Sequence, residues 1–258
     1  MPTALTIAGS DPSGGAGIQA DIKTFEAFGV RGLSVITAIT AQTEESVLGV
    51  YPLPADQLTQ QLAAAAKSEK IDAVKIGMIG SAANVRAIRF FLRSVKIPHV
   101  IIDPVFTSTS GMPLLEPHGL KYLKEELLPI ATVVTPNLDE AQVLTGMRLW
   151  NIGTMKEAAR IIHAEACSLS SPPLKKGGKG EFGLSVLIKG GHLTGDSIDI
   201  LFDGINYVEF PAKRISGKIK HGTGCRLSSA LAACLAKGMP LQDAVKEAKR
   251  FVEEYIRS

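Results

Sequence analysis

The sequence is poor in cysteine and carries almost no excess charge of either sign. Three of its 258 residues are cysteine, and no two of them form a CxxC pair. An odd number of thiols without ligand spacing argues against a disulfide framework and a zinc site, and favours a reducing cytoplasm. The formal net charge is +3 and no stripe of lysine and arginine runs along the chain, so a nucleic acid is not an expected partner.

Long hydrophobic runs and a phosphate loop of the Walker A type are also missing. No apolar stretch is long enough to cross a bilayer, and residues 1–11 lack the basic start of a signal peptide. We therefore expect no membrane partner and a cytoplasmic location. Hydrophobic residues make up 45% of the chain and charged residues 21%, which is typical of a globular protein, and the length suits a single domain over residues 1–258.

Short apolar runs alternate with longer amphipathic segments along most of the chain. The predicted strands are 5–8, 33–40, 73–76, 100–102, 132–135 and 186–189. The predicted helices are 15–28, 55–68, 82–94, 118–128, 138–144, 154–166, 225–237 and 241–255. Continuous apolar strands joined by helices predict an α/β three-layer sandwich, with a central, mostly parallel sheet and helices on both faces. Residues 197–202 and 207–210, joined at Asp203-Gly204, predict a late antiparallel hairpin.

One segment, residues 168–183, differs in composition from the rest. It is rich in serine, proline, glycine and lysine, and it has too few apolar side chains to offset its own ordering entropy. We interpret it as a flexible surface insertion, with a basic lid as the alternative.

The segment His221-Gly222-Thr223-Gly224-Cys225 precedes an alanine-rich helical run. A glycine turn at a helix start directs free backbone N–H groups and the positive end of the helix dipole at one point, which suits a phosphate. The same dipole is expected to lower the pKa of the Cys225 thiol. The alternative is an ordinary glycine turn with a small, inert cysteine.

Polar residues follow several predicted strands where those strands end. Gln42 offers a donor and an acceptor to a heterocycle, Asp103 and Glu140 offer carboxylates for Mg²⁺, and Lys189 offers a cation for phosphates. Alternatives stay open, since Gln42 and Lys189 also suit ordinary surface positions. Asn137 and Glu140 also have the spacing of a helix capping box.

The glycines of residues 9–21 partly match a dinucleotide-binding fingerprint, Gly15-x-Gly17-x-x-Ala20. That fingerprint requires an acidic residue near the end of the second strand, where this chain has Gln42. A dehydrogenase is therefore disfavoured.

These segments together resemble the hydroxymethylpyrimidine/phosphomethylpyrimidine kinase family, nearly end to end. The segments that carry the resemblance are AGSDPSGGAGIQAD, VITAITAQ, VKIGMIGS, IIDPVFTSTSG, TPNLDEAQVLTG, VLIKGGHLTGD and HGTGCRLSSALAA. The resemblance implies a ribokinase-like fold. It also implies two ATP-dependent phosphorylations in thiamin biosynthesis, of 4-amino-5-hydroxymethyl-2-methylpyrimidine and then of its monophosphate.

The resemblance also implies roles for particular residues. The substrate-binding residues would be Gly9, Asp21, Gln42, Met78 and Val105. Cys225 would be the catalytic base, beside an anion hole made by Gly222, Thr223 and Gly224. Asp103, Asn137 and Lys189 would contact the nucleotide, with Asp103 and Glu140 at Mg²⁺. The resemblance further implies ATP as co-substrate, Mg²⁺ and optionally a monovalent cation. It also implies a homodimer.

The chain departs from the resemblance at Arg226, where a small hydroxyl residue is usual. Since a guanidinium pairs well with phosphate oxygens, we expect a phosphate contact there, with a solvated arginine as the alternative. Two further function classes stay open, a pyridoxal kinase with the same fold and a non-catalytic ligand-binding protein.

Overall fold

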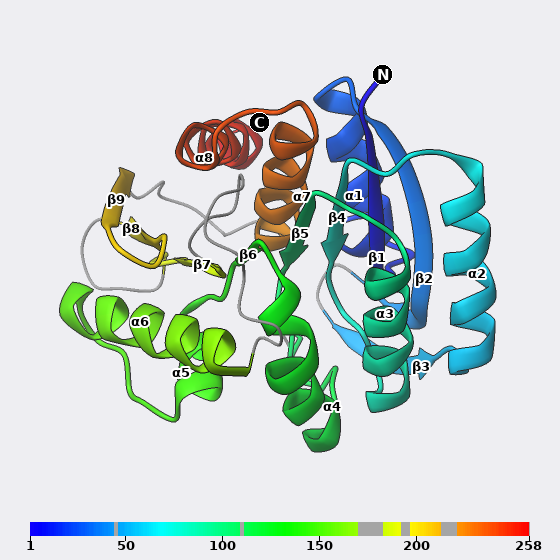
Figure 1. Ribbon diagram of the computed structural model, residues 1–258, viewed down its shortest axis with the longest axis horizontal. Coiled ribbons are helices and arrows are strands. Elements are labelled where there is room, and N and C mark those ends of the chain that lie inside the picture. The colour runs from blue at the N-terminus through cyan, green and yellow to red at the C-terminus, as the bar shows by residue number, and fades with distance from the viewer. Residues whose placement is uncertain (44–45, 109–110, 170–182, 192–196, 213–220, 258) are drawn as a thin grey trace.

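The structure is a computed structural model, and it describes residues 1–43, 46–108, 111–169, 183–191, 197–212 and 221–257 (Figure 1). The predicted insertion lies mostly outside these residues, apart from Ser168, Leu169 and Gly183. In the described part of the chain, no helix is both long enough and apolar enough to cross a membrane.

In the described residues, a nine-stranded sheet forms the centre, in the order β3-β2-β1-β4-β5-β6-β7-β8-β9. The strands are β1 (Thr3–Ser10), β2 (Arg31–Gln42), β3 (Val47–Pro52), β4 (Ala73–Ile76), β5 (His99–Ile102), β6 (Val133–Val134), β7 (Ser185–Ile188), β8 (Ser197–Phe202) and β9 (Tyr207–Ala212). Neighbouring strands from β2 to β7 are parallel, while β3, β8 and β9 are antiparallel to their neighbours. The mostly parallel sheet and the late hairpin are therefore confirmed.

Helices cover both faces of this sheet (Figure 1). One layer contains α1 (Gly17–Ala27), α7 (Thr223–Ala236) and α8 (Leu241–Arg257). The other layer contains α2 (Ala55–Ser68), α3 (Ala82–Ser94), α4 (Pro117–Tyr122), α5 (Leu138–Thr145) and α6 (Ile152–Leu169). The predicted three-layer sandwich is confirmed.

Each sheet face has its own hydrophobic core, because successive strand residues point to opposite sides. Ile101 packs with the α1–α7–α8 layer, whereas Ile102 packs with the other layer. Val133 and Val134 divide in the same way. This double burial explains why the strands are continuous apolar runs in the sequence.

Two elements differ from the sequence prediction. The edge strand β3 was not predicted, since its short sequence contains Gly49 and ends at Pro52, two residues that disfavour strands. The helix predicted over 118–128 begins as α4, continues as a π-helical turn over Leu123–Leu127 and ends as a 3₁₀ turn over Leu128–Ile130. Pro129 lies in that last turn, and proline cannot extend an α-helix.

The parallel strands bring their carboxyl ends to the same edge of the sheet. Residues that follow β1, β2, β4, β5, β6 and β7 therefore meet there, although they lie far apart in the sequence. This edge is the usual ligand side of an open α/β sheet.

Candidate active site

An ion pair between a buried carboxylate and a partly buried ammonium lies at the carboxyl edge of the sheet. Asp103 directly follows β5 and Lys189 directly follows β7, and Nζ of Lys189 lies 2.9 Å from Oδ1 of Asp103. Thr135, which follows the intervening β6, donates its hydroxyl to the same carboxylate at 3.1 Å. Burial alone would raise the pKa of Asp103, but the ammonium groups of Lys189 and Lys75 hold it below its ordinary value.

Glu140 extends this pair on the side of α5. Its Oε2 lies 3.8 Å from Nζ of Lys189 and accepts the backbone N–H of Asn137 at 2.7 Å. The Asn137 side chain in turn accepts the backbone N–H of Glu140, so the capping box is also present. Burial raises the pKa of Glu140 to about 7, and the negative charge of Asp103 raises it further. The positive charge of Lys189 lowers this pKa but offsets only part of the rise.

The N-terminus of α7 lies beside this cluster. Gly222 is the N-cap residue with φ 80°, and none of the described side chains caps the helix there. A Cβ at Gly222 would collide with the carbonyl of Gly15, so this turn requires glycine. A Cβ at Gly224 would lie 3.3 Å from Nζ of Lys189. The first amides of α7, including that of Thr223, therefore start next to a cation, which suits an anion.

Cys225 lies in the first turn of α7, where the thiol accepts the backbone N–H of Gly17 at the start of α1. Burial raises its pKa to about 11; Lys75 lowers it, but the charges of Asp103 and Asp21 act in the same direction as burial. The predicted lowering of this pKa is therefore wrong. Desolvation and two nearby carboxylates outweigh the helix N-terminus.

Beneath the site lies a second ion pair, between Lys75 of β4 and Asp21 of α1. Both side chains have no exposed surface, and Nζ of Lys75 lies 3.0 and 2.9 Å from the two carboxylate oxygens. Asp21 also accepts hydroxyl hydrogen bonds from Thr6 at 2.5 Å and from Ser229 at 2.6 Å. The predicted substrate residue Asp21 thus has its hydrogen-bonding capacity occupied by the protein.

Two serines of α7 connect this helix to both buried carboxylates. Ser229 donates to Asp21, and Ser228 donates to Asp103 at 3.2 Å. The sequence prediction did not include these serines, nor Lys75. A lysine within the apolar strand Ala73–Ile76 is the one available signal, because a buried lysine needs a counter-charge.

Apart from Asp21, the predicted substrate residues lie at or after the ends of β1, β2, β4 and β5. A Cβ at Gly9 would collide with the Met78 side chain, so the glycine allows this close packing. Nε2 of Gln42 lies 2.9 Å from Nε2 of His221, which lies 3.4 Å from Oδ2 of Asp11. Val105 is partly buried and follows β5 by three residues.

Arg226 of α7 contacts the C-terminal helix α8. Its guanidinium lies 4.0 Å from the centroid of the Tyr255 ring in α8, and its side chain is buried. The arginine thus joins α7 to α8 in the described part of the chain, and the phosphate contact stays a prediction. Cation–π packing explains why it tolerates burial.

Comparison with known proteins shows the family to which the chain is similar. The family model described as Phosphomethylpyrimidine kinase matches residues 11–258. The hydroxymethylpyrimidine/phosphomethylpyrimidine kinase of Rhizobium meliloti is 46% identical over 254 residues, which cover 98% of this chain and 90% of that protein. The thiamine biosynthesis bifunctional protein ThiED of Geobacter sulfurreducens is 42% identical over 98% of this chain but 49% of its own length. The chain thus spans about half of that bifunctional relative.

Solved structures of two kinds of kinase have the same fold. The phosphomethylpyrimidine kinase of Clostridium difficile has a TM-score of 0.81 at 38% identity, over 99% of this chain and all of that one. The pyridoxal kinase of Staphylococcus aureus, in complex with AMP-PCP and pyridoxal, has a TM-score of 0.85 at 33% identity, over 100% of this chain and 89% of that one.

Proposed function

This chain belongs to the phosphomethylpyrimidine kinase family, and we propose that it uses ATP to phosphorylate 4-amino-5-hydroxymethyl-2-methylpyrimidine to the monophosphate and then to the diphosphate. These reactions serve thiamin diphosphate biosynthesis. The observation that carries the proposal is the position of the α7 N-terminus, which lies beside Lys189 and Asp103 and presents Cys225. Phosphoryl transfer requires such an arrangement, because positioning and charge neutralisation supply most of the catalysis.

The nucleotide is held at the sheet edge near β6 and β7 in this proposal. Lys189 contacts its phosphates, and the amides around Gly222, Thr223 and Gly224 stabilise the negative charge that develops during transfer. Asp103 keeps the Lys189 ammonium in place through the 2.9 Å contact. Asn137 adds to the nucleotide site from the start of α5.

The acidic residues of this edge suit Mg²⁺. Asp103 and Glu140 bring two carboxylates to one ammonium, and the mutual repulsion of the carboxylates contributes to the raised pKa of Glu140. A divalent cation held by one or two carboxylates, waters and substrate phosphates relieves such an excess of negative charge. When bound, Mg²⁺ would neutralise phosphate charge, and Asp103 and Glu140 are the residues that would hold it.

The pyrimidine binds on the β1–β2–β4 side of the edge. The amide of Gln42 pairs with a ring nitrogen and its adjacent amino group, because that edge of the heterocycle also presents one acceptor and one donor. Gly9, Met78 and Val105 supply the apolar walls. Asp21 acts indirectly, since it holds Lys75 and α7 in position and has no surface of its own.

Cys225 accepts the proton of the hydroxyl group in the first phosphorylation. An alcohol is a poor nucleophile until it loses its proton, so a base accelerates this step. In the second phosphorylation the attacking atom is an anionic phosphate oxygen, which needs no base. The backbone amides around Gly222, Thr223 and Gly224 therefore act in both phosphorylations, and Cys225 acts mainly in the first.

An ATP-consumption assay tests this function against its alternatives. Purified chain is incubated with ATP and Mg²⁺ together with the hydroxymethylpyrimidine, with pyridoxal, or with neither, in the presence and absence of K⁺. The proposal expects preference for the pyrimidine and a second turnover on its monophosphate. A pyridoxal kinase, favoured by the fold match to the Staphylococcus aureus enzyme, would prefer pyridoxal. A ligand-binding protein would consume no ATP with either, and K⁺ stimulation would identify the monovalent cation.

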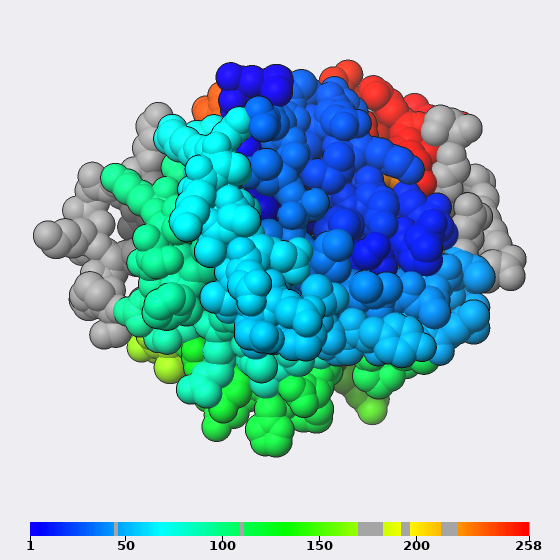
Figure 2. All heavy atoms as spheres, turned by 90° about the vertical axis from the view of Figure 1, so that its right-hand side faces the viewer, coloured from blue at the N-terminus to red at the C-terminus, as the bar shows by residue number. Residues whose placement is uncertain are grey.

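We further propose a cytoplasmic homodimer whose protomers each form one catalytic domain. The exposed edge of β2–β3 supports the dimer, because the directly paired Ile39 and Tyr51 are 55% and 62% exposed. The side of the molecule built by α2 and this edge faces the viewer in Figure 2. Contiguous exposed apolar surface is typical of protein–protein interaction sites. Light scattering after size exclusion should give a molar mass twice the 27.3 kDa of one chain. Tyr51→Asp should reduce the measured molar mass to that of a monomer.

A further inference from the structure

A buried carboxylate of the late hairpin binds the turn that follows Lys189. Asp199 of β8 is 6% exposed, and its Oδ1 accepts the backbone N–H of Gly190 at 2.9 Å. Gly190 directly follows Lys189, whose ammonium contacts Asp103 in the candidate active site. A side chain outside that site thus holds the backbone next to its lysine.

This hydrogen bond takes over where the pairing of β7 with β8 stops. The antiparallel register of the two strands ends at Ile188 and Ile200. A Cβ at Gly190 would collide with the carbonyl oxygen of Ile198, so the turn approaches β8 too closely for a larger residue. A buried backbone N–H needs an acceptor, and here the Asp199 carboxylate provides it.

The backbone of Lys189 is also held from the side of β6. Its N–H donates to the carbonyl oxygen of Pro136 at 2.8 Å, between β6 and α5. Two consecutive N–H groups, those of Lys189 and Gly190, therefore fix the chain toward β6 and toward β8. The lysine side chain is long and flexible, so a fixed backbone limits where its ammonium can lie.

Lys249 of the C-terminal helix α8 supplies the counter-charge of Asp199. Its Nζ lies 2.5 Å from Oδ2 of the carboxylate, and the two side chains are 11% and 8% exposed. A carboxylate buried this far is costly without a cation. The two oxygens of Asp199 thus have separate partners, Gly190 on one and Lys249 on the other.

We propose that Asp199 is a positioning residue for Lys189, and that it acts through the Gly190 turn to hold the ammonium toward the phosphates of the nucleotide. The inference rests on the proposed kinase function, in which Lys189 contacts those phosphates. Lys249 contributes to stability, since it binds the carboxylate oxygen that faces away from the turn. Small displacements of a group that faces the substrate are expensive, so losing the Gly190 contact should weaken nucleotide binding.

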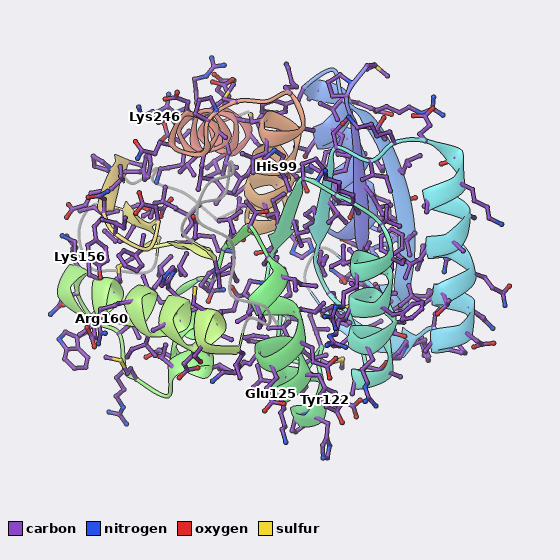
Figure 3. The ribbon with its side chains drawn as sticks, in the orientation of Figure 1. His99, Tyr122, Glu125, Lys156, Arg160 and Lys246 are labelled. Carbon is purple, nitrogen blue, oxygen red and sulfur yellow. The ribbon has the colours of Figure 1, made fainter. Side chains whose placement is uncertain are left out.

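Calorimetric titration of the full chain with the ATP analogue AMP-PCP and Mg²⁺ tests the proposal. Asp199→Ala removes the acceptor of the Gly190 N–H, and the affinity should fall about tenfold or more. Asp199→Asn keeps an oxygen acceptor and should keep most of the affinity. Lys249→Met should lower the urea midpoint but keep most of the affinity. Lys246→Met, at an exposed position of α8 that Figure 3 labels, should change neither.

The double variant Asp199→Ala/Lys249→Met provides the test if Asp199→Ala folds poorly. It removes both charges, so the urea midpoint should return toward that of the parent while the affinity for AMP-PCP stays low. The KM for ATP should rise in this variant. The KM for the hydroxymethylpyrimidine should not change, because the pyrimidine is assigned to the β1–β2–β4 side of the edge.

The possible outcomes separate this inference from the function on which it rests. A folded Asp199→Ala or double variant that binds AMP-PCP like the parent would overturn the inference alone. Equal losses in Asp199→Asn and Asp199→Ala, or equal rises in both KM values, would also overturn it, since they would indicate a general loosening of the fold. A parent chain that binds no AMP-PCP would overturn the proposed function, and the inference with it.

Discussion

The ammonium of Lys189 and the carboxylate of Asp103 lie 2.9 Å apart, although 86 residues separate them in the sequence. Strand order explains the contact, because β5 and β7 flank β6 and end at the same edge of the sheet. The pair stands between Glu140 and the start of α7. It therefore connects the acidic side of the site to its anion-binding side.

Removing one member of this pair should cost both stability and activity. Lys189→Met leaves the Asp103 carboxylate buried without its cation, and we expect a loss of about 3–5 kcal/mol in the free energy of unfolding. The rate constant kcat should fall about 10²-fold or more, because a charge facing the phosphates is lost. Urea unfolding and steady-state kinetics measure the two effects.

The double variant Asp103→Asn/Lys189→Met separates these effects. It removes both charges, so much of the stability should return while the activity stays low. Recovery of activity together with stability would show that the pair has a purely structural role.

The buried pair below the site gives a second prediction. Lys75→Met should lower the free energy of unfolding by about 3–5 kcal/mol, since Asp21 would keep only the hydroxyl donors Thr6 and Ser229. Ser229→Ala, which leaves the ion pair intact, should cost only about 1–3 kcal/mol. Denaturant titration of both variants measures the difference, and equal losses would contradict a dominant role for Lys75.

Much of this site was predictable from the sequence because its residues follow apolar strands directly. Asp103 and Lys189 each come immediately after such a run, and parallel strands bring those positions together. The Lys75–Asp21 pair was not predictable, because it depends on β1 lying between β2 and β4 and on α1 packing over them. The two carboxylates that raise the pKa of Cys225 follow β5 (Asp103) and lie on α1 (Asp21), far from Cys225 in the sequence, so the helix dipole of α7 alone could not predict the shift.

The third prediction concerns the two phosphorylations. Cys225→Ala should reduce the rate with the hydroxymethylpyrimidine about 10²-fold or more, which is the usual contribution of a general base. The rate with the monophosphate should change far less, because a phosphate oxygen is already anionic. Separate assays with each substrate measure the ratio. Cys234→Ala, at a buried position of the same helix, is the matched control and should leave the ratio unchanged.

The pH dependence of the first step follows from the same thiol. Burial raises the pKa of Cys225 to about 11, so the thiolate fraction of the free enzyme should rise about tenfold per pH unit below that value. The kcat/KM for the hydroxymethylpyrimidine should therefore increase between about pH 7 and pH 9, and Cys225→Ala should flatten the profile. The folded chain favours the protonated thiol, because the pKa of Cys225 is about 11 when folded, whereas the ordinary pKa of a cysteine thiol is 9.0. The contribution of this thiol to the free energy of unfolding is therefore lost as pH rises from 9 toward 11, so the kinetic profile is measured below pH 9.

Arg226 provides the last prediction, because the structure assigns it to packing and the sequence suggested a phosphate. Its guanidinium covers the Tyr255 ring at 4.0 Å and joins the active-site helix α7 to the C-terminal helix α8. Arg226→Thr should lower the free energy of unfolding by about 1–2 kcal/mol and leave the KM values for ATP and for the monophosphate unchanged. Tyr255→Leu should give a similar loss of stability, and the double variant should lose less than the sum of the two, since both substitutions remove the same contact. A large rise in either KM for Arg226→Thr, with little change in stability, would instead mean that the arginine leaves Tyr255 and reaches the phosphate during turnover.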